Sequence, residues 1–183
     1  MKKIVLLLVM LLGLAFSAEA QRIKKNALGL RIGDNDGFGA ELSYQRALGD
    51  NNRLELDLGW NDSKYYDAMK LTGLYQWVWN IQGGFNWYAG AGGGIGTYSF
   101  KDKYYFPGNG NGNGNGNGND YDVDFDDDDS GTFLFIAGDI GIEYVFDFPL
   151  QLSLDFRPEL YFGNDFRESN FGPDVALGAR FTF

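Results

Sequence analysis

Residues 53–61, Arg-Leu-Glu-Leu-Asp-Leu-Gly-Trp-Asn, decide the fold of this chain. From Leu54 to Trp60 every second residue is apolar, and from Glu55 to Asn61 the alternate residues are acidic, amide or glycine. Successive side chains of a β-strand point to opposite faces, whereas in a helix the same face recurs about every 3.6 residues. The stretch therefore predicts a strand with one apolar and one polar face.

The same two-residue period recurs along the rest of the chain, between clusters of Gly, Asn and Asp that favour turns. It is clearest over 151–162 and 174–183, and weaker over 26–33, 37–47, 68–79, 84–98 and 132–146. Beyond the N-terminus no stretch predicts a helix. We expect an all-β chain whose eight strands close into an antiparallel up-and-down transmembrane β-barrel or its soluble counterpart.

The composition narrows the range of functions. The chain has 183 residues without histidine or cysteine, so it lacks disulfides, thiolate metal sites and the usual general base of hydrolytic enzymes. Its 15 basic and 25 acidic side chains give a formal charge of −10, which argues against binding to nucleic acid. We expect no catalysis and no cofactor.

The N-terminus has the layout of an export signal. Two lysines precede an apolar run that ends at Phe16, and Ala-Glu-Ala at 18–20 follows as a small-x-small cleavage site. The run is shorter than the roughly twenty residues that a transmembrane helix needs. We expect a secretory signal peptide over 1–20, cleaved near Ala20, and a barrel over 21–183.

Two kinds of eight-stranded barrel fit the alternation. A soluble periplasmic, lipocalin-like barrel hides its apolar face inside to bind an apolar ligand, whereas a transmembrane barrel turns that face to lipid. The aromatic residues favour the membrane form, because they gather near the strand ends like the two girdles of a membrane barrel. One predicted girdle holds Trp77, Trp79, Phe85, Trp87, Phe146, Phe148, Phe181 and Phe183, and the other holds Trp60, Tyr65, Tyr66, Tyr98, Phe100, Phe133, Phe162, Phe166 and Phe171.

The connections between the predicted strands also alternate in length. Short turns are expected near 48–52, 80–83 and 147–149, and the other connections are expected at 34–36, 63–67, 99–131 and 163–171. Bacterial outer-membrane barrels have short periplasmic turns and longer outer loops. The longest connection, 99–131, is therefore expected to face the cell exterior.

The signal peptide, the eight amphipathic strands and the ending Arg180-Phe181-Thr182-Phe183 resemble the small bacterial outer-membrane β-barrels, which include OmpX-like and OmpA-like transmembrane domains and porin-like proteins. The resemblance implies a location in a Gram-negative outer membrane, in contact with its lipid and lipopolysaccharide. It also implies that the terminal Phe183 is the signal read by the barrel-assembly machinery. The expected role is structural or a surface interaction, with a narrow channel for small solutes or ions as the alternative.

In a membrane barrel the polar strand faces line the interior, and here they carry charges of both signs. Such charges are expected to pair, because an isolated charge is costly to remove from water. Lys70 lies on one of these faces. The predicted lumen charge network consists of Arg31, Glu41, Glu55, Asp57, Asp139, Glu143, Asp155, Arg157, Glu159 and Arg180.

The longest predicted loop holds an unusual acidic stretch. An unbroken Gly-Asn repeat over 108–119 predicts a flexible linker, and seven aspartates follow within ten residues. Carboxylates are ligands of Ca²⁺, so a weak divalent-cation site is predicted at Asp120, Asp122, Asp124 and Asp126. The stretch is not an EF-hand, because Phe125 and Gly131 stand where that motif has glycine and glutamate. The alternative is a solvated charge run that keeps the loop extended.

Two further features concern the strands themselves. Gly90, Gly92, Gly94 and Gly96 share one face of the segment 84–98, where small residues allow tight curvature or leave room for bulky neighbours inside the barrel. Pro158 lies inside a predicted strand and removes a backbone donor, so it predicts a bulge or local strain.

Overall fold

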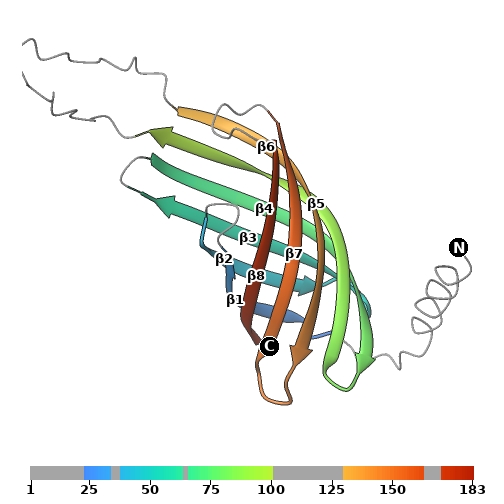
Figure 1. Cartoon of the computed structure of the whole chain (residues 1–183). Coiled ribbons are helices and arrows are strands. Elements are labelled where there is room, and N and C mark those ends of the chain that lie inside the picture. Colours follow the sequence, from blue (N-terminus) through green and yellow to red (C-terminus); the bar gives the residue numbers. More distant parts are fainter. Residues whose placement is uncertain (1–22, 34–37, 64–65, 101–129, 163–169) are drawn as a thin grey trace, which may run out of the picture.

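The computed structural model describes residues 23–33, 38–63, 66–100, 130–162 and 170–183, which form eight antiparallel strands closed into a barrel (Figure 1). The strands are β1 (Asn26–Gly33), β2 (Ala40–Ala47), β3 (Asn52–Asp62), β4 (Tyr66–Gln82), β5 (Phe85–Phe100), β6 (Ser130–Val145), β7 (Gln151–Phe162) and β8 (Phe171–Thr182). Each strand pairs with its neighbours in chain order. The predicted eight-stranded up-and-down barrel is confirmed.

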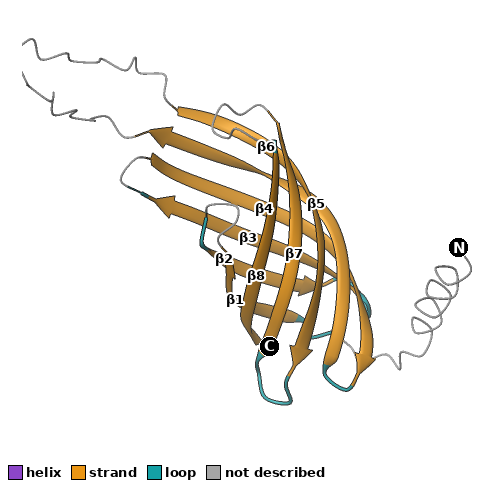
Figure 2. Ribbon diagram, in the orientation of Figure 1, coloured by secondary structure: helices purple, strands orange, loops and turns teal. Residues whose placement is uncertain are grey.

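The first and last strands close the barrel. β1 pairs with β8 from Ala27 opposite Thr182 to Gly33 opposite Ala176. β1 and β2 have 8 residues each, whereas β4 has 17 and β5 and β6 have 16. The wall is therefore tallest at β4, β5 and β6, which extend beyond the shorter strands in Figure 1. The part of the chain that the structure describes holds no helix long and apolar enough to cross a membrane (Figure 2).

The apolar face of each strand points outward. In β3 the side chain of Leu56 is 40% exposed and that of its neighbour Glu55 is 1% exposed. In β8 Leu177 is 64% exposed and Ala176 is 2% exposed. An outward apolar face and an inward charged face are the reverse of a soluble barrel, so the lipocalin-like alternative does not fit this structure.

The aromatic residues near the short turns between strands form a belt on the outside of the barrel. Trp79 and Trp87, on β4 and β5, stack with ring centroids 4.2 Å apart. Ring contacts also join Phe85 to Tyr144, and Tyr144 to Phe146. A belt of amphipathic rings at one end of an apolar wall is typical of a membrane interface.

The second predicted girdle is wrong in part. Trp60, Phe162 and Phe171 are half exposed on the outside. Phe133, however, lies inside the barrel and is only 2% exposed, because its position in β6 shares the inward register. Tyr66 and Tyr98 are partly buried and pack against the apolar residues inside the barrel, which include Phe133. Tyr65 and Phe166 lie outside the described residues, and so does the side chain of Phe100.

Pro158 does not produce the predicted bulge. The β6–β7 ladder keeps one register on both sides of it, from Ala137 opposite Glu159 to Ile140 opposite Phe156. The two intervening pairs are missing from this ladder because proline has no N–H to donate. The register shift that the described ladders do contain lies in β4, between Asn80 and Gln82.

The glycine face of β5 makes room for rings inside the barrel, as predicted. A Cβ at Gly94 would lie 2.5 Å from Cζ of Phe135, and a Cβ at Gly96 would collide with the ring of Phe133. These rings and Tyr161 form the centre of an interior apolar cluster, in which Phe135 and Tyr161 have centroids 5.5 Å apart. The full cluster consists of Phe38, Ala68, Leu74, Phe133, Phe135, Ala137 and Tyr161.

Candidate functional site

The structure places all ten predicted lumen charges inside the barrel, each no more than 5% exposed. They come from β1, β2, β3, β6, β7 and β8, and they lie there because their positions belong to the inward register of these strands. We call this group, with the buried Arg53, Lys70 and Asp174, the interior ion-pair network; Asp139 is connected to it by a hydrogen bond from Gln76.

Arg31 joins four strands through three carboxylates. Its guanidinium donates to Asp155 on β7 at 2.6 Å, to Asp174 on β8 at 2.6 Å and to Glu41 on β2 at 2.9 Å. The guanidinium presents its donors in a planar fork, so it can satisfy several acceptors in one plane. Arg31 therefore ties the closing strands β1 and β8 to their neighbours from within.

Glu55 is the corresponding hub among the carboxylates. Oε1 accepts from Arg157 and from Arg180, each at 3.1 Å. Oε2 accepts from the side-chain amides of Gln45 at 2.5 Å and Gln76 at 3.0 Å. Four donors from β2, β4, β7 and β8 thus converge on one carboxylate of β3. Such satisfaction offsets the cost of burying its charge.

Lys70 lies where the ion-pair network meets the interior apolar cluster. Its Nζ is 3.1 Å from Glu41 and 3.2 Å from Glu159, whose other oxygen accepts from the Tyr161 hydroxyl. The same ammonium lies 4.9 Å from the ring centroid of Phe38. A cation over an aromatic face is favourable by about 0.5–2 kcal/mol. Lys70 therefore links the polar and apolar halves of the interior.

Several interior residues that bond within the network were not predicted as site residues from the sequence. Arg53 donates to Glu143 at 2.6 Å, and its guanidinium lies over the ring of Tyr88 at 4.7 Å. Asp174 bonds Arg31, and Gln76 bridges Glu55 and Asp139. Arg53 and Asp174 share the inward register of residues that were predicted, so the alternation itself is the signal that finds them. The long-range partner of each cannot be read from it.

The network fills the interior and cross-links its walls. Hydrogen bonds of the network join residues as far apart in sequence as Arg31 and Asp174, so they form only when the barrel is closed. Among the described residues no group of three or more acidic, histidine or cysteine side chains is arranged to hold a metal ion. The arrangement can hold strands in register, and it occupies the space that a wide pore would need.

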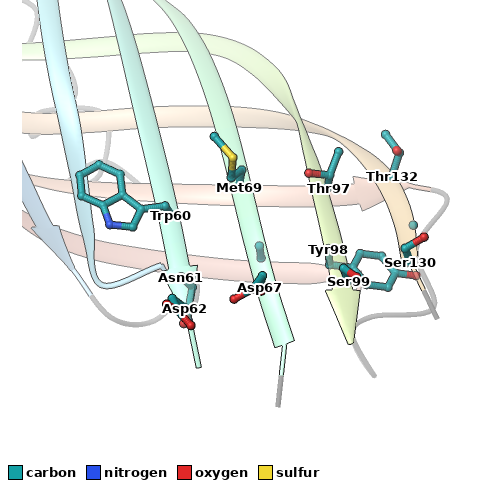
Figure 3. Close-up of a pocket in the computed structure, with 12 residues that line it drawn as sticks. Trp60, Asn61, Asp62, Asp67, Met69, Thr97, Tyr98, Ser99, Ser130 and Thr132 are labelled. Carbon is teal, nitrogen blue, oxygen red and sulfur yellow. The ribbon is translucent and has the colours of Figure 1, made fainter. Parts of the chain in front are cut away.

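A separate hollow of about 680 Å³ lies at the loop end of β3, β4, β5 and β6 (Figure 3). It spans three consecutive rows of paired residues across these strands, the middle one running from Asn61 through Ala68 and Tyr98 to Gly131. No member of the ion-pair network lines it. Its lining residues are Trp60, Asn61, Asp62, Asp67, Ala68, Met69, Thr97, Tyr98, Ser99, Ser130, Gly131 and Thr132.

Three predictions concern residues at or beyond the ends of the described strands. The signal peptide over 1–20 and the acidic stretch with Asp120, Asp122, Asp124 and Asp126 lie outside the described residues, so both stay predictions. Phe183 is described: its backbone exchanges two hydrogen bonds with Asn26 at 2.9 and 3.0 Å, next to the β1–β8 seam. Its ring is 59% exposed and stacks on Phe181.

Comparison with known proteins identifies the fold. No protein-family model matches the chain, and no curated protein matches it. Among solved structures it is similar to the N-terminal β-barrel domain of Pseudomonas aeruginosa OprF, with a TM-score of 0.52 and 13% identity over 86% of this chain and 95% of that one. It is also similar to Neisserial surface protein A (NspA), with a TM-score of 0.53 and 13% identity over 86% and 93% of the two chains. The chain has the fold of the eight-stranded outer-membrane β-barrels.

Proposed function

We propose that the protein is an integral outer-membrane barrel with a structural or surface-interaction role and no catalytic activity. The observation that carries the proposal is the inverted polarity of the wall, on which Leu56, Leu177 and their outward neighbours are exposed while charged residues face inward. Such a wall is stable in hydrocarbon and would aggregate in water. The similar fold of the OprF barrel domain and NspA supports the outer membrane as the location.

An interior crowded with side chains supports a structural role over a narrow channel. The ion-pair network places charged groups from every strand except β5 inside the barrel, and the interior apolar cluster adds rings from β6, β7 and the segment before β2. The carboxylates that an acid–base mechanism would need are held by arginine and lysine at 2.6–3.5 Å, except Asp139. Lipid and lipopolysaccharide are the partners that the outward face would contact.

The test combines membrane fractionation with gel mobility. We expect the full-length protein in the outer-membrane fraction, and a faster-migrating band in SDS before boiling than after, because a closed barrel resists unfolding by the detergent. A protein that purifies from the periplasm without detergent and shows no mobility shift would refute the proposal.

We also propose that Phe183 is the signal read by the barrel-assembly machinery. Its exposed ring at the β1–β8 seam is accessible to a binding partner. We expect Phe183→Ala to lower the yield of assembled barrel in cells by several-fold while the refolded variant keeps its stability in detergent. The matched control is Phe171→Ala, because Phe171 is a half-exposed ring at the start of β8, whereas Phe183 directly follows the end of β8. Equal yields for wild type and Phe183→Ala would refute the assembly role.

A further inference from the structure

The charges inside the barrel do not balance. Among the described residues, eight buried carboxylates face only five buried cations, which leaves a surplus of three negative charges. The buried cations are Arg31, Arg53, Lys70, Arg157 and Arg180, and the buried carboxylates are Glu41, Glu55, Asp57, Asp139, Glu143, Asp155, Glu159 and Asp174. Burying a charge without a partner costs roughly several kcal/mol of desolvation free energy. The surplus negative charges therefore require a positive charge to compensate them.

Asp139 carries one of these surplus charges. It is the one buried carboxylate in the described part of the chain that makes no ion pair. Its Oδ2 accepts a hydrogen bond from Gln76 at 2.5 Å, and its Oδ1 has no hydrogen-bond partner among the described residues. Asp139 is only 5% exposed, so its contact with bulk water is small.

The one cation that acts on Asp139 among the described residues is shared with other carboxylates. The charged groups that act on it are Arg157 and Asp155 on β7 and Glu55 on β3, while Tyr88 faces it from β5. Arg157 is shared among several carboxylates: its guanidinium pairs with Asp57 at 2.9 Å and with Glu55 at 3.1 Å, and it attracts Asp139 without forming an ion pair with it. The remaining charged neighbours repel a second negative charge.

We propose that the barrel interior binds a small cation from solution at Asp139. This cation is either a proton or an alkali metal ion. Both are hard, positively charged species that bind a carboxylate oxygen, and the unpartnered Oδ1 is the site. The cation is bound in the folded barrel and released on unfolding. The proposal does not depend on the cellular location of the barrel.

The test compares the full chain with Asp139→Asn after refolding in detergent micelles, with the folded fraction read from gel mobility across a urea series. We divide the folding equilibrium constant of the wild type by that of Asp139→Asn. If a proton is bound, this ratio falls as pH rises, by up to tenfold per pH unit. If an alkali ion is bound, the same ratio rises by up to tenfold for each tenfold increase in NaCl, at ionic strength held constant with choline chloride.

Glu143→Gln is the matched control, because Glu143 is the carboxylate that pairs with Arg53 at 2.6 Å. Its neutralisation leaves a buried cation without its partner, so we expect a lower urea midpoint at every pH, whereas Asp139→Asn is expected to keep or raise the midpoint at high pH and low NaCl. A ratio that responds to neither pH nor NaCl would overturn the proposal. So would an Asp139→Asn midpoint as low as that of Glu143→Gln under all conditions.

Discussion

The ring of Phe133 on β6 lies flat against the backbone of Gly96, its cross-strand partner on β5. The three atoms that a Cβ at Gly96 would meet first all belong to this ring. Phe133 also packs against Phe135 and Tyr161, with centroids 6.3 and 5.6 Å away, so the ring has little freedom to move aside. The glycine and the ring together fill the interior near the loop end.

Gly96→Ala is therefore expected to destabilise the barrel by about 1–3 kcal/mol, since overpacking forces the ring or the backbone to shift. The urea midpoint of the refolded protein measures the effect. Gly73→Ala is the control on the outer face, where a Cβ would meet Leu56 at an ordinary 3.6 Å. Combining Gly96→Ala with Phe133→Leu should recover part of the loss, and strict additivity of the two changes would argue against the contact.

Leu56 tests the direction of the strand faces. It is 40% exposed on the outward face of β3, and its neighbours across the ladders are Tyr44 and Gly73. In a bilayer Leu56→Arg should cost about 2–4 kcal/mol near the midplane, and Leu56→Ala much less. Refolding into lipid vesicles with a urea series provides the measurement. Similar stabilities for the two variants would place this face away from lipid.

Arg31 tests the contribution of the interior network. Arg31→Met keeps much of the side-chain volume but leaves Glu41, Asp155 and Asp174 without this donor. Removing one partner of a buried ion pair costs about 3–5 kcal/mol, so a large fall in the urea midpoint is expected. Arg46→Met is the control, because the hydrogen bond of Arg46 to Asn26 is exposed and should matter little. Equal midpoints for the two variants would contradict the network's role.

Conductance tests whether the interior is closed. We expect wild-type protein in planar bilayers to show no discrete ion-conducting steps, because the network and the apolar cluster fill the barrel. The double variant Phe133→Ala and Tyr161→Ala removes two rings of the cluster and should raise ion flux, provided gel mobility shows that it is folded. Steady conductance by the wild type would instead favour the narrow-channel alternative.

The alternation in residues such as Leu54 to Asn61 predicts strand positions well, because each strand has one apolar and one polar face and the period is local. The observed strands extend the predicted ones by a few residues at several ends, for example to Tyr66 and Gln82 in β4. Phe133 was misplaced because an aromatic residue near a strand end can belong to either face. Only its register in β6 places it inside.

The sequence by itself determined the number of strands, the apolar and polar faces and the identity of most interior charges, since these follow from local periodicity. The tertiary structure decided which charges meet. Arg31 reaches Asp155 and Asp174, which are 124 and 143 residues away, only because the closed barrel brings β1, β7 and β8 together. Closure also leaves Asp139 without an ion-pair partner among the described residues, and it packs the rings of β6 against the glycines of β5. Such pairings depend on the stagger of the strands around the barrel, a global property that no single strand encodes.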